Sequence, residues 1–167
     1  MFALVKGESF EIILRIYRER RFIYASDCGV FEEGRHFLSA TADGNQPRVR
    51  PFGAVSEFEG RIYIQTGNQK AVFAQLEANP RVEISGMIGE RWIRLSGVIL
   101  LDPWREARAA MLEQNPALRD MYSEDDGICE VLYFREGIAK ICSFTAPPET
   151  YRICPCCNPA HLSLALS

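Results

Sequence analysis

Alternating apolar and polar positions dominate residues 36 to 153 and predict a mainly β protein with flanking helices. The extended runs lie at 36–42, 46–58, 61–66, 81–88, 91–101, 129–134, 138–144 and 150–153. Short turns separate most of them, which favours antiparallel pairing, with 129–134 and 138–144 forming a hairpin that turns at Arg135 to Gly137. Pro51 inside the second run indicates an edge strand or a bulge. If some six or seven of these runs form strands, we expect closure into a small barrel.

A helical spacing of apolar residues replaces this alternation in three places, at 9–20, 71–79 and 104–114. Asp102 as the cap residue and Pro103 at the first helical position predict the start of the third helix. The residues expected to face the core are Phe10, Ile13, Leu14 and Tyr17 in the first helix, Val72, Phe73 and Leu76 in the second, and Trp104, Ala107 and Met111 in the third.

Length and composition indicate one globular domain over residues 1–153, followed by a cysteine-containing tail at 154–167. The chain has 167 residues, of which 47% are apolar and 25% charged, with a formal net charge of −3. Nothing in this balance favours nucleic acid or an anionic membrane as a partner. The first eight residues lack the pattern of a secretion signal, and no apolar run would span a bilayer, so we expect a cytoplasmic protein.

The loop that precedes the second helix, Thr66-Gly67-Asn68-Gln69-Lys70, has the composition of an anion site. The first turn of a helix has unpaired N–H groups and a partial positive charge, and phosphates bind there. Gly67 allows close backbone approach, and the polar side chains add donors. Lys70 is unfavourable for the helix itself unless an anion lies nearby. The alternative is an ordinary helix start with a solvated lysine.

Arg48 and Arg50 share one side of the second predicted strand and repel each other unless they are solvated or share an anionic or aromatic partner. Facing the loop at 66–70, they would frame a phosphate at one end and a planar heteroaromatic ring at the other. The alternative is an exposed edge strand protected by charge. Trp92 belongs either to the core or to a wall that faces such a ring.

The six cysteines do not have the even spacing of a disulfide framework, since three of them fall in the tail. Cys154, Cys156, Cys157 and His161 form a set that could ligate zinc, but their spacing is more compressed than in usual structural sites. A loose thiol-bearing tail is the main expectation, and a metal or redox site is the alternative.

Five motifs in register resemble the pyridoxamine 5'-phosphate oxidase-like, FMN-binding split-barrel family, and most closely its Nim-type nitroimidazole reductase branch. The similar segments are 48–53 (RVRPFG), 60–63 (GRIY), 66–70 (TGNQK), 79–82 (NPRV) and 91–97 (RWIRLSG). The segments "MYSEDDGICEVLYF" and "ICSFTAPPET" also resemble the C-terminal strands of that branch. Altogether the resemblance covers roughly residues 36 to 153.

The resemblance implies a six-stranded antiparallel split barrel that dimerises with FMN at the subunit interface. By position, Arg48, Val49, Arg50, Pro51 and Phe52 would line the isoalloxazine and ribityl chain. The phosphate would be held by Thr66, Asn68, Gln69 and Lys70, and Trp92 would lie near the flavin.

The chain departs from true pyridoxamine 5'-phosphate oxidases in two respects. It lacks their C-terminal Arg-x-His element, and Gly53 stands where they have a lysine. The register of residues 25–38 is unassigned, and His36 is expected to be a surface or turn residue. We therefore expect an FMN-dependent oxidoreductase acting on a small planar substrate such as a nitroaromatic, with unassigned catalytic residues. The alternative is a non-catalytic flavin- or haem-binding module.

Overall fold

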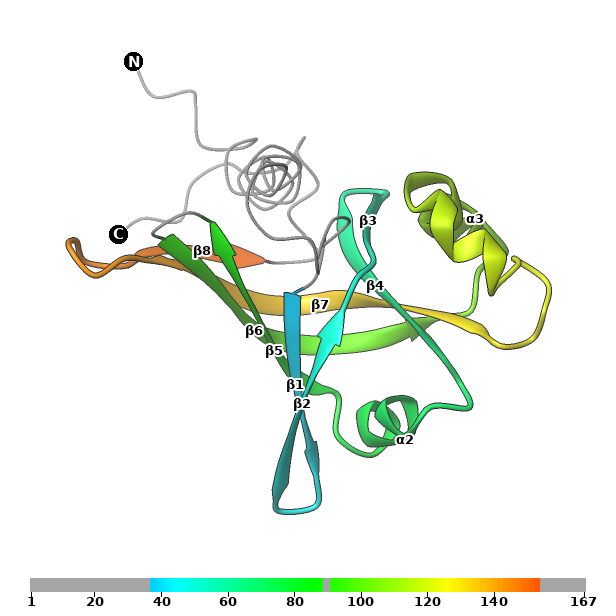
Figure 1. The fold of residues 1–167 in the computed structure, drawn as a ribbon, viewed down its shortest axis with the longest axis horizontal. Coiled ribbons are helices and arrows are strands. Elements are labelled where there is room, and N and C mark those ends of the chain that lie inside the picture. Colours follow the sequence, from blue (N-terminus) through cyan, green and yellow to red (C-terminus); the bar gives the residue numbers. More distant parts are fainter. Residues whose placement is uncertain (1–36, 89–90, 154–167) are drawn as a thin grey trace, which may run out of the picture.

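The computed structural model describes residues 37–88 and 91–153, which form a mostly antiparallel β structure with two α-helices and one 3₁₀ helix (Figure 1). The predicted helix at 9–20, His36 and the tail at 154–167 lie outside the described residues. The strands are β1 (Phe37–Asp43), β2 (Gln46–Phe52), β3 (Val55–Phe58), β4 (Arg61–Gly67), β5 (Arg81–Ile88), β6 (Arg91–Asp102), β7 (Cys129–Cys142) and β8 (Glu149–Ile153). The helices are α2 (Ala71–Ala78), α3 (Arg105–Gln114) and the 3₁₀ helix η1 (Pro116–Asp120).

All eight described strands belong to one sheet, ordered β2-β1-β5-β6-β7-β4-β3, with β8 added beside β7. The sheet does not close, so the closure expected from the number of strands is wrong, and the open sheet agrees with a split barrel. One edge of β7 is divided between two partners: its first residues pair with β4 and its last residues pair with β8. The expected number of six strands is wrong, because the described chain has eight.

The sequence pattern gave the wrong strand boundaries in two places, at 46–58 and at 129–144. The run at 46–58 is not one strand but two, because the chain leaves the ladder at Gly53-Ala54. Its first part pairs with β1, and its second part pairs with β4. The Gly53-Ala54 link therefore connects the two end strands of the sheet, β2 and β3.

The predicted hairpin at 129–144 is also wrong, because β7 runs without a turn through Arg135 and Gly137. The register between β6 and β7 shifts at this point, between Val98 and Ile99, so the expected turn is a bulge. Gly97 and Gly137 are opposite each other there, and a Cβ on Gly97 would lie 2.4 Å from the Glu136 carbonyl oxygen. Only glycine at position 97 permits this close approach of the strands.

The core consists of two groups of buried side chains on opposite faces of β7, with Leu132 and Phe134 in the larger group and Val131 in the smaller one. The larger group joins β4, β5, β6 and β7 to α2 through Val72 and Leu76, as predicted. The smaller group joins Tyr63 and Val131 to Ala107 and Met111 of α3. Trp104 was expected to be buried with them and is instead 69% exposed, because the helix begins one residue later.

The start of α3 is fixed by Asp102, whose carboxylate accepts the Trp104 backbone N–H at 2.9 Å and the Tyr63 hydroxyl at 2.8 Å. The aspartate is buried, and so is the tyrosine ring. Burial first, and then the bond to Asp102, raises the pKa of Tyr63. The predicted cap at Asp102 with Pro103 at the first helical position is wrong, because Trp104 is the N-cap residue and α3 begins at Arg105. Asp102 instead joins the end of β6 to β4 through Tyr63.

The two helices cover different parts of the sheet (Figure 1). Helix α2 lies between the β1–β2 hairpin and the end of β4, whereas α3 packs on β3 and the first part of β7. None of the helices in the described ranges is long and apolar enough to cross a bilayer.

Candidate anion site at the start of helix α2

Helix α2 begins without the side chains that normally satisfy a helix N-terminus. Lys70 occupies the N-cap position, makes no side-chain capping bond, and no acidic residue follows in the first turn. The backbone N–H of Lys70 donates to the Gly67 carbonyl at 3.0 Å, which closes a tight turn before the helix. The partial positive charge of the helix start and the Lys70 ammonium are thus next to each other, an arrangement that an anion would stabilise.

Asn68 holds this turn in place through hydrogen bonds to the chain around the start of β7. Its side-chain amide donates to the Gly127 carbonyl at 2.8 Å and to Glu130 Oε1 at 3.2 Å. Its backbone N–H donates to the Ile128 carbonyl at 3.0 Å. The predicted donor role of Asn68 is therefore accompanied by a structural role, in which it attaches the 66–70 loop to the segment that precedes β7.

The remaining two polar residues of the loop differ in exposure. Gln69 is exposed at the turn. Thr66 is 1% exposed, and among the described residues its hydroxyl has no hydrogen-bond partner. A buried hydroxyl without a partner costs free energy, so it marks a place where a ligand atom or a further group would be stabilised.

Arg50 reaches the same helix from β2. Its guanidinium donates to Thr41 Oγ1 and to Gln75 Oε1, both at 2.8 Å, and the Thr41 hydroxyl donates to Gln75 Oε1 at 2.7 Å. Partial burial and then the neighbouring charge of Arg48 lower the pKa of Arg50. No carboxylate of the described residues faces Arg50, so its charge is compensated only by neutral groups.

The other residues of the predicted 48–52 motif lie on both sides of β2. Arg48 is exposed and pairs with Asp43 at 3.0 Å across the β1–β2 hairpin. Phe52 lies on the same side of the strand as the arginines and is buried in the larger core group. Val49 and Pro51 are exposed on the other side. Of this motif, Arg50 therefore makes a hydrogen bond to α2, and Phe52 shares the core group of Val72 and Leu76.

Trp92 is at the opposite end of the molecule from the loop. It pairs with Cys142 at the end of β7, whereas Gly67 pairs with Cys129 at the beginning of β7. The path along β7 between these two positions is roughly 40 Å at the usual rise of an extended strand. The Trp92 ring contacts the exposed Phe144 at 5.0 Å between centroids, so both form an aromatic surface rather than part of the core.

The face of the sheet opposite α2 carries an exposed apolar surface, which we call the outer face. Its large exposed apolar residues are Leu38, Val49, Met87 and Ile138. A groove of about 830 Å³ crosses it, with Gly97 and Gly137 in its floor and Arg81 and Arg152 among its charged lining. An apolar surface of this kind is typical of a protein or ligand interface.

Sequence reasoning missed two residues of the site, Gln75 and Tyr122. Gln75 fixes Arg50 from one turn further along α2, and glutamine at a half-buried helix position carries no signal of such a bond. The Tyr122 ring lies 5.6 Å from the Lys70 ammonium. Tyr122 is far from the loop in sequence, so only the β4–β7 pairing brings it there.

The predicted metal ligands cannot be placed, because the tail at 154–167 lies outside the described residues. Within residues 37–88 and 91–153, no group of three or more histidine, cysteine, aspartate or glutamate side chains is arranged to hold a metal ion. The described cysteines, Cys129 and Cys142, are buried free thiols. Burial raises the pKa of Cys129, as expected for an unreactive thiol.

A curved antiparallel sheet, split along β7 and with a cationic helix start at its side, defines the class of split-barrel proteins. The chain belongs to the pyridoxamine 5'-phosphate oxidase family, whose profile matches residues 30–125. No match is found among curated proteins.

Solved structures agree with this assignment. A NimC/NimA family protein from Clostridium acetobutylicum is 44% identical, covers 89% of this chain and 94% of its own, and superposes with a TM-score of 0.74. A pyridoxamine 5'-phosphate oxidase-related, FMN-binding protein from Nostoc punctiforme is 15% identical, covers 92% and 100%, and has a TM-score of 0.55. A haem-binding protein from Mycobacterium smegmatis is 18% identical, covers 87% and 60%, and has a TM-score of 0.57. The last two share only the fold with this chain.

Proposed function

We propose that the chain is a cytoplasmic, dimeric flavoprotein that binds FMN and transfers electrons to a small planar acceptor such as a nitroaromatic. The observation that carries the proposal is the pair of cations, Lys70 and Arg50, that meet α2 without a carboxylate partner among the described residues. The family membership and the NimC/NimA relative support the flavin and the type of acceptor.

The residues present fit the phosphate end of FMN. The uncapped start of α2 would bind the phosphate with backbone N–H groups, Lys70 would neutralise part of its charge, and Gln69 would add a neutral donor. The partnerless Thr66 hydroxyl is directly next to this turn. Asn68 would act by keeping the turn attached to β7. Arg50, held by Thr41 and Gln75, would present its remaining donors to the ribityl chain or the ring, and Arg48, Val49, Pro51 and Phe52 would complete that side.

A single chain does not assemble the whole proposed site, because Trp92 lies at the other end of β7. A second copy docked on the outer face would supply it. The exposed apolar residues of that face favour a dimer, and the groove that Ile138 lines would become an enclosed space at the interface. In that arrangement Trp92 of one chain would lie beside the flavin whose phosphate is held by the other chain.

Bound FMN would supply the redox chemistry, while the protein positions the ring and excludes water around it. The described residues contribute cations and neutral donors on the phosphate and ribityl side, and an aromatic surface from Trp92. These groups hold and orient a cofactor. No general acid or base is assigned among them.

The absorption spectrum of the purified protein tests the proposal directly. We expect a yellow protein whose released ligand is FMN, which bleaches anaerobically with NADH or NADPH and is reoxidised by a nitroaromatic compound. Bound flavin that no nicotinamide reduces would indicate a non-catalytic module. A Soret band, or a protein that fails to retain added FMN, would overturn the proposal.

A further inference from the structure

Tyr122 lies over the start of α2, although it is more than fifty residues away in the sequence. A Cβ on Gly67 would be 3.3 Å from the Tyr122 hydroxyl oxygen and 3.5 Å from its ring, so the side chain rests on the Gly67 backbone. The Lys70 ammonium is 5.6 Å from the centre of the same ring. The tyrosine and the lysine therefore bound the same small region above the turn.

The Tyr122 hydroxyl has no hydrogen-bond partner among the described residues. The residue is half-buried, and a phenol in such a place normally finds a partner. The hydroxyl lies against the Gly67 backbone, and the Lys70 ammonium lies over the same ring. The ammonium can only donate and the hydroxyl can donate, so an anionic oxygen in this region would accept from both.

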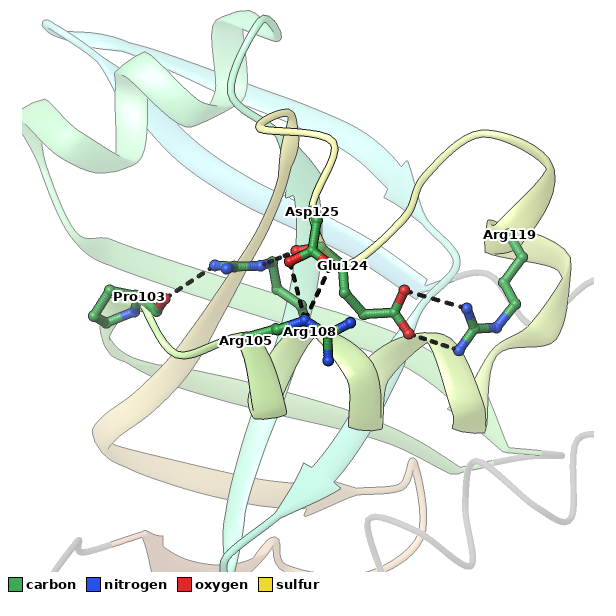
Figure 2. A network of polar contacts seen from close by, with 6 residues as sticks. All are labelled: Pro103, Arg105, Arg108, Arg119, Glu124 and Asp125. Atoms are coloured by element: carbon green, nitrogen blue, oxygen red, sulfur yellow. Dashed lines mark hydrogen bonds and ion pairs between the residues drawn. The ribbon is translucent and has the colours of Figure 1, made fainter.

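The position of Tyr122 is fixed by the 121–128 segment, which we call the brace loop. The Tyr122 backbone N–H donates to the Leu118 carbonyl at 2.9 Å. Further along, Arg108 of α3 donates to the Glu124 carbonyl at 2.9 Å and to the Pro103 carbonyl at 3.1 Å (Figure 2). Asn68 then holds Gly127 and Ile128 from the other side. A hydroxyl held from both ends of its loop is preorganised for a ligand.

We infer that Tyr122 is a direct ligand of the FMN phosphate, donating its hydroxyl to a phosphate oxygen from the side of the turn opposite the helix. This inference rests on the proposed function. It adds a residue from the brace loop to a site otherwise formed by β4 and α2. It also predicts a selectivity, because riboflavin has no phosphate for this hydroxyl to bind.

Equilibrium binding of FMN and of riboflavin to apoprotein carrying Tyr122→Phe tests the inference. The phenylalanine keeps the ring that packs on Gly67 and faces Lys70, and it removes only the hydroxyl. We expect FMN affinity to fall about tenfold, the effect of one hydrogen bond to a charged group, and riboflavin affinity to remain unchanged. Tyr133→Phe is the matched control, since the Tyr133 ring also has a cation above it, Arg61 at 4.6 Å, but lies four residues away along the β4–β7 ladder.

The outcomes separate the inference from the proposal on which it rests. If the unmodified protein binds FMN more tightly than riboflavin and Tyr122→Phe keeps that preference intact, Tyr122 is not a phosphate ligand and the FMN site stands. Equal losses for both flavins would also overturn the inference, since they indicate a structural role for the hydroxyl. If the unmodified protein binds neither flavin, the proposed function itself fails.

Discussion

Lys70 and Arg50 are the two cations whose surroundings are least favourable to them in the described part of the chain. Lys70 is placed where the helix dipole repels it, and its ammonium lies over the face of the Tyr122 ring. Arg50 is half-buried beside a second arginine, which lowers its pKa. Each position would be improved by an anion, and this common requirement is the physical basis of the proposed site.

Replacing Lys70 with alanine should weaken FMN binding by about 1–3 kcal/mol, the scale of one charge-assisted hydrogen bond. Riboflavin affinity should change far less, because the ammonium is expected to act on the phosphate. Isothermal titration of the apoprotein measures both. Lys140→Ala is the matched control, since it removes the same charge from an exposed position on β7. Equal affinities for FMN in the two variants would remove Lys70 from the site.

Asp126 organises the brace loop through three backbone N–H groups. Partial burial acts to raise the pKa of its carboxyl, but the bonds from Cys129, Ile128 and Ser123 outweigh it and lower the pKa below its usual value. A carboxyl whose pKa is lower in the folded state stabilises the fold above its unfolded pKa, about 3.9. That contribution is lost as the pH falls through the folded value.

Asp126→Ala should therefore lower the free energy of unfolding at pH 7, by about 1 kcal/mol for bonds that are partly screened by solvent. The difference between the variant and the unmodified protein should shrink as the pH falls below about 4. Urea denaturation at pH 7, 5 and 3 measures it. A difference that stays constant over this range would show that the carboxylate charge is not involved.

Sequence patterns predicted the turn at 66–70 directly before α2, but they gave no sign of Gln75 or Tyr122, for a physical reason. The 66–70 loop could be predicted because strand, turn and helix are contiguous, and their composition carries the signal. Gln75 and Tyr122 could not, because their contacts depend on how β4 pairs with β7 and how α2 lies across β1. Trp92 was assigned to the same site by resemblance, and within one chain β7 keeps it apart from the loop.

At the scale of the elements, arginines of α3 and η1 hold the brace loop (Figure 2), and the brace loop contacts the start of α2 through Asn68 and through the Tyr122 ring beside Lys70. Three arginines of α3 and η1 contact the brace loop, but in different ways. Arg105 pairs with Asp125 and Arg119 pairs with Glu124, each in an ion pair at 3.0 Å with exposed arginine side chains. Arg108 instead donates to main-chain carbonyls on both sides of it. Main-chain bonds of this kind fix a loop, whereas exposed ion pairs contribute little.

Arg108→Ala should loosen the brace loop and lower FMN affinity severalfold, whereas Arg105→Ala should leave it nearly unchanged. Both variants remove one guanidinium from the same helix, so they form a matched pair. Amide hydrogen exchange of residues 121–128, with and without FMN, measures directly how often the brace loop opens. Faster exchange in Arg105→Ala than in Arg108→Ala would contradict the assignment of the bracing role to Arg108.

The same contrast between local and tertiary signals explains how far the fold was predictable. The helix at 71–78 and strands 61–67, 81–88 and 91–102 were predicted almost to their ends because alternation and helical spacing are local. The Arg135-Glu136-Gly137 segment has a turn-like composition, yet it continues as strand. Gly137 lies opposite Gly97 in the β6–β7 ladder, and the register shift there is taken up as a bulge. Pairing with β6 thus determines that residues 135–137 form a bulge and not a turn.

At the scale of the whole molecule, the outer face is where a second copy is expected. Ile138→Glu places a charge in the middle of that face and should convert the dimer into a monomer in sedimentation velocity experiments. FMN retention should fall with it, because Trp92 is then no longer supplied by a partner. Trp104→Glu is the control, since Trp104 is exposed on α3 and not on the sheet. A monomeric unmodified protein that still retains FMN would contradict the shared site.

β7 contributes hydrogen bonds to β6 along most of its length, to β4 at its beginning and to β8 at its end. Neither of the two core groups can therefore come apart while the other remains paired, since both depend on the same fourteen-residue strand. The described domain should lose its structure in a single cooperative transition. The amide protons at the centre of β7 should be the slowest in the protein to exchange, and should do so only through global unfolding.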